Sequence, residues 1–405
     1  MQTVLKAATL ARRTSAYRFV QEHRASTIGE KGKMSHKRKI VHIPKVGGGT
    51  LKERLKGLLR ELTAQNAVSG SEQSVASYMK RELEKVSDSV SVDHMGNVFA
   101  IKKAAQDGPV VMIAAHSDEI GAIVKSVDTN GYIWFEKIGG AIDALLVGRK
   151  VWVGQHLGVI GVKAGHLQSP KERSEVKKHT EMYVDVGATS REQVLAMGIS
   201  TGTPIAYNSP LESFTNSDRM CGKAIDDRLG CAVLLELMRD ASPPKGTLVA
   251  AVTVQEEVGL RGAKVAAFRV RPDFAIALDT MPCGDTPDVD FYRELPVGIG
   301  LGPAFQFTSG TATGFLISPA MKRFLTDTAK RAGVGYQVTT FPGGNTDATA
   351  IHLVREGIPT GVIALPRRYS HSPVEVADIN DAVGALEILK TVVKRMAEPL
   401  DWSFV

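Results

Sequence analysis

Cysteine is scarce in this sequence, with three residues among 405. Cys221, Cys231 and Cys283 form no CxxC pair, which excludes a Cys-rich structural zinc site and a disulfide framework. The simplest interpretation is a protein of a reducing compartment, in which each thiol is a small buried side chain.

Long apolar runs are absent as well. No run reaches the roughly 18 residues that a membrane helix needs, and the N-terminus lacks the apolar stretch of a secretory signal. We therefore expect a cytoplasmic protein without a membrane partner. A phosphate-binding loop and the HExxH zinc motif are also missing, and the glycines of residues 298–303 lack the full dinucleotide fingerprint.

The basic character of the chain is confined to one end. The net charge is +7, but residues 1–40 hold ten basic and two acidic side chains, so the other 365 residues carry a net charge of −1. The folded part is therefore not expected to bind nucleic acid. Residues 1–45 are basic with no acid before Glu22, as in an organellar transit peptide. A disordered tail, or a true start near Met34, are the alternatives.

The hydrophobic pattern predicts an α/β fold. Four apolar runs have the character of buried parallel strands, and helical patterns separate the later ones. This alternation predicts a mixed central sheet flanked by helices. Ser69 and Glu72 are expected to form a capping box for the second helix. The four runs are residues 109–115, 247–254, 273–279 and 359–366.

The length of the chain favours two domains, or one domain with an insertion. Residues 121–209 differ from the rest in their short strands, their Gly and Asn turns and their weak helical periodicity. Such a pattern is typical of a small β domain. We therefore expect a β domain at 121–209, inserted into an α/β domain made of residues 46–120 and 210–405.

Potential metal ligands follow each of the four apolar runs. In an open α/β sheet, the carboxyl ends of the strands line the crevice where ligands bind. Taken singly, such residues are commonly polar turns, helix caps or solvated loop residues, but the joint pattern favours a metal site. The residues are His116 and Asp118, Glu256 and Glu257, Asp279, and His371, with Asp226 and Asp227 before a helix.

The mixture of ligand types favours a pair of metal ions. Two His and three carboxylates without Cys suit zinc, cobalt or manganese. Five ligands exceed what one catalytic metal with an open position uses. A carboxylate shared by two metals about 3.5–4 Å apart would use all five.

Six motifs, in order, resemble those of the tetrahedral (TET) aminopeptidases. This family includes glutamyl and leucyl aminopeptidases, and some members carry the name endoglucanase M. The likeness extends from about residue 52 to about residue 395. The motifs are AAHSDEIGAIV, KAIDDRLGCAVLLEL, VTVQEEVGLRGA, ALDTMPCGDTPDVD, PGGNTDATAIHLVREGIPT and RRYSHSPVEV.

The resemblance implies a fold, an assembly and a reaction. Members have a central mixed sheet with helices and an inserted small β-barrel, here residues 121–209, which is used in dimerisation and assembly. Their dimers typically assemble into dodecamers whose active sites face an internal chamber. The implied reaction is the metal-dependent removal of N-terminal residues from peptides with a free N-terminus.

The resemblance also implies how two divalent metal ions per subunit are held. His116 and Asp279 would bind one ion. Glu257 and His371 would bind the other, with Asp226 as the bridge between them. Zinc is the first expectation for both ions, and cobalt or manganese are the alternatives.

Further acids would act beside these ions. Glu256 would be the general base that takes a proton from the attacking water and returns it to the leaving amine. Asp118 would hydrogen-bond His116 and fix its ring. Asp227 would support the backbone of its neighbour rather than bind metal.

The sequence departs from the family pattern at two positions. Ser117 stands where Met is common, and Asn345 stands where a third Gly is common. Neither change removes a ligand, so we expect activity with altered specificity. Gly343, Gly344 and Asp347 either line the substrate site or form a tight turn that caps the next helix.

Three other functions remain open from the sequence. A carboxypeptidase or deacylase of the same clan would share the His-x-Asp and Glu–Glu elements, but its inserted domain is typically α+β. A glycosidase would use two carboxylates without a metal, which leaves both His residues and Asp226 without a role. A non-enzymatic assembly protein would have no use for a complete set of ligands and a base.

Overall fold

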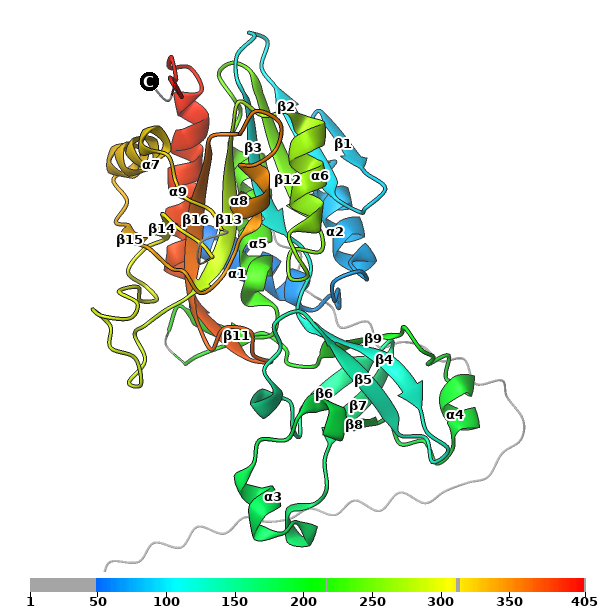
Figure 1. Cartoon of the computed structure of the whole chain (residues 1–405). Coiled ribbons are helices and arrows are strands. Elements are labelled where there is room, and N and C mark those ends of the chain that lie inside the picture. Colours follow the sequence, from blue (N-terminus) through cyan, green and yellow to red (C-terminus); the bar gives the residue numbers. More distant parts are fainter. Residues whose placement is uncertain (1–48, 216, 311–313, 404–405) are drawn as a thin grey trace, which may run out of the picture. The chain divides into compact units, whose positions relative to one another are not determined.

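The computed structural model describes residues 49–215, 217–310 and 314–403 (Figure 1). The transit peptide or disordered tail predicted for residues 1–45 lies outside the described residues. In the part that is described, no helix combines the length and the apolar character needed to cross a membrane.

Four parallel strands form the middle of the central sheet. Because each is buried on both faces, each is an almost continuous apolar run. They coincide with the four runs singled out in the sequence, so the predicted α/β fold is confirmed. In spatial order they are β12 (Thr247–Thr253), β3 (Val110–His116), β13 (Phe274–Pro282) and β16 (Thr360–Arg368).

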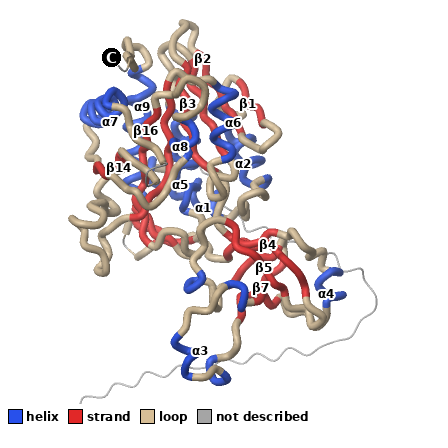
Figure 2. Tube along the Cα trace, in the orientation of Figure 1, coloured by secondary structure: helices blue, strands red, loops and turns tan. Residues whose placement is uncertain are grey.

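Shorter strands extend this sheet at both sides (Figure 2). Most of them pair antiparallel. Beside β12 lie β2 (Val98–Lys103) and β1 (Ser89–Val92). Beyond β16 lie β17 (Glu375–Asp378), β11 (Arg219–Gly222) and β10 (Glu212–Ser213). Two further strands, β14 (Ala304–Gln306) and β15 (Gln337–Thr339), pair with each other, and β14 also pairs with β16.

Helices cover both faces of the sheet because side chains alternate along the buried strands. In β3, Val111, Ile113 and Ala115 pack into one apolar core, and Met112 and Ala114 pack into another. The first core includes α1 (Leu51–Thr63), α2 (Gln73–Leu83), α5 (Ile225–Asp240), α7 (Pro319–Ala332) and α9 (Ile379–Arg395). The second includes α6 (Arg261–Val270) and α8 (Asp347–Ile351).

A closed antiparallel barrel with its own apolar core interrupts the α/β part after β3 (Figure 1). The predicted β-rich insert is therefore a six-stranded barrel. Its strands, in chain order, are β4 (Gly121–Val127), β5 (Ile133–Ile138), β6 (Lys150–Val153), β7 (His156–Gly161), β8 (Tyr183–Asp185) and β9 (Pro204–Tyr207). Short helices lie between them: η1 (Asp143–Leu145), η2 (Gly165–Leu167), α3 (Pro170–Ser174), η3 (His179–Glu181) and α4 (Arg191–Ala196).

The three cysteines are free thiols. Cys231 and Cys283 are buried, as expected. Cys221 is only half-buried, because β11 lies near the edge of the sheet, where one side of the strand is less covered.

Candidate active site

The strand-end residues predicted from the sequence gather at one edge of the sheet. His116 is the last residue of β3, and Asp279 lies in β13. Glu256 and Glu257 follow the end of β12, and His371 follows the end of β16. The parallel direction of the four strands brings these side chains together although more than 250 residues separate the first from the last.

Two groups of ligand atoms share Asp226, which lies at the start of α5. The first is His116, Asp226 and Asp279, and the second is Asp226, Glu257 and His371. Within each group the ligand atoms lie within 4.8 Å of one another. Imidazole nitrogens and carboxylate oxygens are the donor set that zinc, cobalt and manganese accept, so the residues fit a pair of such ions.

The two carboxylate oxygens of Asp226 face different groups. Oδ1 lies 3.2 Å from Nε2 of His116, and Oδ2 lies 3.5 Å from Nε2 of His371. In the first group, Nε2 of His116 is also 3.7 Å from Oδ1 of Asp279. In the second, Nε2 of His371 is 3.4 Å from Oε2 of Glu257. This geometry suits Asp226 to bridging.

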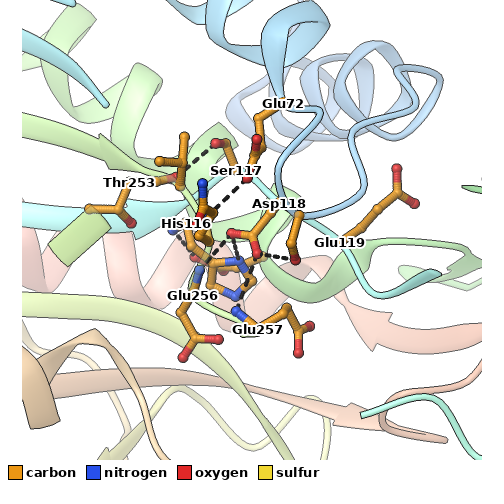
Figure 3. A network of polar contacts seen from close by, with 12 residues as sticks. Glu72, His116, Ser117, Asp118, Glu119, Thr253, Glu256 and Glu257 are labelled. Atoms are coloured by element: carbon orange, nitrogen blue, oxygen red, sulfur yellow. Dashed lines mark hydrogen bonds and ion pairs between the residues drawn. The ribbon is translucent and has the colours of Figure 1, made fainter. Parts of the chain in front are cut away.

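Asp118 anchors the turn that carries the adjacent glutamates (Figure 3). Its Oδ1 accepts the backbone N–H of Glu256 at 3.0 Å, and its Oδ2 accepts that of Glu257 at 3.2 Å. Gln255 has a left-handed φ of 55°, so β12 does not continue through the pair. The two carboxylates consequently point to different sides (Figure 3), with Glu257 toward His371.

Asp118 is itself fully buried and held by Ser69. Its Oδ2 accepts the Ser69 hydroxyl at 2.6 Å, and its Oδ1 lies 3.5 Å from Nδ1 of His116, at ion-pair distance but longer than a good hydrogen bond. Burial alone would raise the pKa of Asp118, but the hydrogen bonding and positive charge of His116 lower it below its usual range. Asp118 is therefore a carboxylate that steadies both the loop and the ring.

The capping box expected from Ser69 and Glu72 does not form. Glu72 is the N-cap residue of α2 but makes no side-chain cap hydrogen bond. Its Oε1 accepts the backbone N–H groups of Gly70 and Gln255 instead, at 2.7 and 3.2 Å. Both residues of the predicted box thus support the turn after β12, because tertiary contacts compete with the local cap.

Buried carboxyl groups crowd together in the site and raise one another's pKa values. Burial, together with the nearby Asp226 carboxylate, raises the pKa of Glu257 to about 8. Burial likewise raises the pKa of Glu256 well above its usual range, and the Asp279 and Glu257 carboxylates add to this. Such a cluster is stabilised by bound cations.

Sequence reasoning missed Arg367, the one arginine among the described residues that line the cavity beside the cluster. Arg367 lies in β16, and its guanidinium contacts Oδ2 of Asp226, donates to Oγ1 of Thr280 at 2.5 Å and lies 3.0 Å from Oε1 of Glu375. Both it and Glu375 are almost fully buried. The signal in the sequence that could have revealed it was a charged residue directly after the apolar run of residues 359–366, where the other candidates follow their runs.

The remaining candidates have distinct positions. Asp227 accepts the backbone N–H groups of Gly230 at 3.0 Å and of His116 at 3.3 Å. Asp347 accepts the Thr253 hydroxyl at 2.5 Å and does not line the cavity. Ser117 donates to the backbone of Thr253 at 2.7 Å and does not face the ligands.

A cavity of about 370 Å³ opens beside the cluster. Glu256, both groups of candidate ligands and the loop of residues 343–346 line it. Its size suits the terminal residues of a peptide rather than a folded protein.

Comparison with known proteins identifies relatives across most of the chain. The profile of the M42 glutamyl aminopeptidase family matches residues 96–388. A lysyl aminopeptidase of Pyrococcus furiosus is 31% identical over 85% of this chain and 98% of its own length. A glutamyl aminopeptidase of Lactococcus lactis is 31% identical over 83% of this chain and 94% of its own length.

Solved structures show the same fold. An aminopeptidase from the archaeon Desulfurococcus kamchatkensis superposes with a TM-score of 0.83, at 31% identity, over 88% of this chain and 100% of its own. The TET1 peptidase of Pyrococcus horikoshii, which assembles into a tetrahedron or a large octahedral shell, superposes with a TM-score of 0.75, at 27% identity, over 84% of this chain and 99% of its own.

Proposed function

The chain belongs to the M42 glutamyl aminopeptidase family, and from that premise we propose that this aminopeptidase uses two divalent metal ions and Glu256 to remove N-terminal residues from peptides. The observation that carries the proposal is the pair of ligand groups that share Asp226 beside a cavity lined by Glu256.

Each ion would be held by ligands from separate strands. His116 and Asp279 would hold one ion, Glu257 and His371 the other, and Asp226 both. Zinc is the proposed metal, with cobalt or manganese as alternatives of the same donor preference. When bound, such ions acidify a water and polarise the peptide carbonyl.

Glu256 would move the proton. Its carboxyl lines the cavity, and its backbone is fixed by Asp118. It would accept a proton from the attacking water and deliver that proton to the amine that leaves. Asp118 would also orient the His116 ring through Nδ1.

The acidic cluster would also select for a free N-terminus. Carboxylates in the cavity wall attract the α-ammonium group of a peptide, whereas an acylated N-terminus brings no charge to pair with them. This favours an exopeptidase over a carboxypeptidase or a deacylase.

A substrate panel tests the reaction class. Aminoacyl 4-nitroanilides with a free amine should be cleaved, and N-acetylated dipeptides and cellodextrins should not. A chelator should abolish the cleavage, and added zinc, cobalt or manganese should restore it. Cleavage of blocked substrates alone would favour a deacylase or carboxypeptidase, and chelator-resistant cleavage of a glycoside would favour a glycosidase.

We also propose a division of labour between the two parts of the chain. Residues 46–120 and 210–405 would form the catalytic domain, and residues 121–209, which contain the barrel, would form the surface for dimerisation and assembly into a dodecamer. The resemblance to a TET1 peptidase that assembles into a tetrahedron supports this. Light scattering should give a mass near twelve times that of one chain.

A further inference from the structure

Each charged side chain in the cavity wall already has a role or an ion-pair partner within the proposed site. Among the described residues that line the cavity, the acids and histidines are the candidate ligands and Glu256, and Arg367 is the remaining charged residue. None of these groups is left over to pair with a charge on the side chain of a substrate.

Arg367 is not available as an anion receptor. Its guanidinium contacts Asp226, Thr280 and Glu375 and is 3% exposed. Freeing it to bind a substrate carboxylate would leave Asp226 and Glu375 buried without their counter-ion, which is costly.

The rest of the described wall carries no charged side chain. Leu260, Met281, Pro282 and Phe341 form its apolar part, and its other members are glycines and the neutral polar residues Thr280, Gln306, Asn345, Thr346 and Ser370. Leu260 is half-buried and belongs to no apolar cluster of the fold. Its apolar side chain is therefore available to contact a substrate in the cavity.

We propose that this cavity selects peptides whose N-terminal residue has a neutral, apolar side chain of the size of Leu, Met or Phe. The inference rests on the proposed aminopeptidase function, which places the α-amine and the scissile bond at the acidic cluster. The side chain of the first residue then extends along the neutral wall.

The physical reason is desolvation. A Glu or Lys side chain in this wall would lose water and gain no partner of opposite charge, whereas an apolar side chain gains from leaving water. This chain would therefore differ in preference from both of its relatives that are named for charged residues, the lysyl and the glutamyl aminopeptidase.

The test is kcat/KM of the metal-loaded full chain on Leu, Met, Phe, Ala, Glu and Lys 4-nitroanilides. We expect Leu, Met or Phe to exceed Glu and Lys by at least about tenfold, the discrimination that pocket contacts of this kind supply. Equal or better cleavage of the Glu or Lys anilide would overturn the inference and leave the proposed function standing. Cleavage of none of the anilides would overturn both.

A matched pair of variants tests the wall itself. Leu260→Ser should lower kcat/KM for the Leu anilide about tenfold and change that for the Ala anilide much less. Leu353→Ser is the control, because Leu353 is 70% exposed and does not line the cavity, and it should leave both values unchanged. An equal loss on both anilides in Leu260→Ser would contradict the assignment of this wall.

Discussion

The backbone of Gly140 lies against the imidazole of His371. A Cβ built on residue 140 would overlap Nδ1 of that ring and lie 2.9 Å from Cε1. Its neighbour Gly139, with a φ of +74°, would bring a Cβ within 3.3 Å of the Cβ of Glu257. The loop that leaves β5 of the barrel thus shapes the space for both His371 and Glu257.

Gly140→Ala should therefore cost the protein one of its two proposed metal ions. The added methyl displaces the His371 ring, which is the far end of a side chain and can move without unfolding the chain. Metal analysis should find one ion per chain in place of two, with activity lowered about 10–100-fold, as for other groups that orient ligands. The absorption spectrum of the cobalt-loaded protein should lose the contribution of the second site.

Gly165→Ala is the control for that experiment. Gly165 lies in a different segment of the insert, between β7 and β8, and a Cβ there would meet no atom within 4 Å. This variant should keep two ions and full activity. Two ions with unchanged affinity in Gly140→Ala would show that the contact does not position His371.

Glu256→Gln should separate catalysis from metal binding. The amide cannot accept the proton of the attacking water, so kcat should fall by about 10²–10⁴-fold, while the metal content stays at two ions per chain. Glu294→Gln, at an exposed position outside the cavity, should have no effect. Loss of metal in Glu256→Gln would mean that this residue is a ligand and not the base.

Arg367→Met should destabilise the metal-free protein more than the metal-loaded one. Removal of this guanidinium leaves Asp226 and Glu375 buried without their counter-ion, at a cost of about 3–5 kcal/mol. Bound metal supplies positive charge to Asp226 and should offset part of that loss. Thermal unfolding of the variant and of the unsubstituted protein, with and without a chelator, measures the loss of stability in each metal state.

Arg368→Met is the matched control for the charge effect. Arg368 pairs with Asp285, and both side chains are about one-fifth exposed, so its loss should cost about 1 kcal/mol or less. That cost should be the same with and without metal. An equal loss of stability in both metal states of Arg367→Met would contradict the role of Arg367 as the counter-ion of Asp226.

Asp381→Asn should flatten the fall in stability between about pH 4 and pH 7. Burial, together with the Asp378 and Asp285 carboxylates, raises the pKa of Asp381 to about 7. The folded state therefore holds a proton that the unfolded chain releases near pH 4. The stabilisation is complete below pH 4 and is lost as the pH rises to about 7, at up to about 1.4 kcal/mol per pH unit.

The measurement for Asp381 is the free energy of unfolding of both proteins across that range. The variant can still accept one of the amide hydrogen bonds that Gly300 and Gly302 donate to Asp381, at 2.7 and 2.8 Å. Other buried acids titrate in both proteins alike, so the difference in slope reports on residue 381. Identical slopes would contradict the raised pKa.

Local patterns in the sequence determined the architecture and the list of candidate ligands. Parallel strands that are buried on both faces must be nearly continuous apolar runs, so each of β3, β12, β13 and β16 could be predicted from its own stretch of sequence. Short strands and glycine turns predicted a small β domain, and only the family resemblance implied that this domain is a barrel. Because the carboxyl ends of parallel strands meet at one edge, polar residues at these ends could be grouped without any knowledge of distances.

Only the tertiary structure decided which contacts hold those residues in position. The turn after β12 depends on Asp118, Ser69 and Glu72, which lie far from it in sequence and which local rules assigned to other tasks. The burial of Arg367 against Asp226, and the contact of Gly140 with His371, likewise join segments more than 100 residues apart. Periodicity and capping patterns report on neighbours along the chain, whereas these contacts arise when packing excludes water from groups that the chain brings together only on folding.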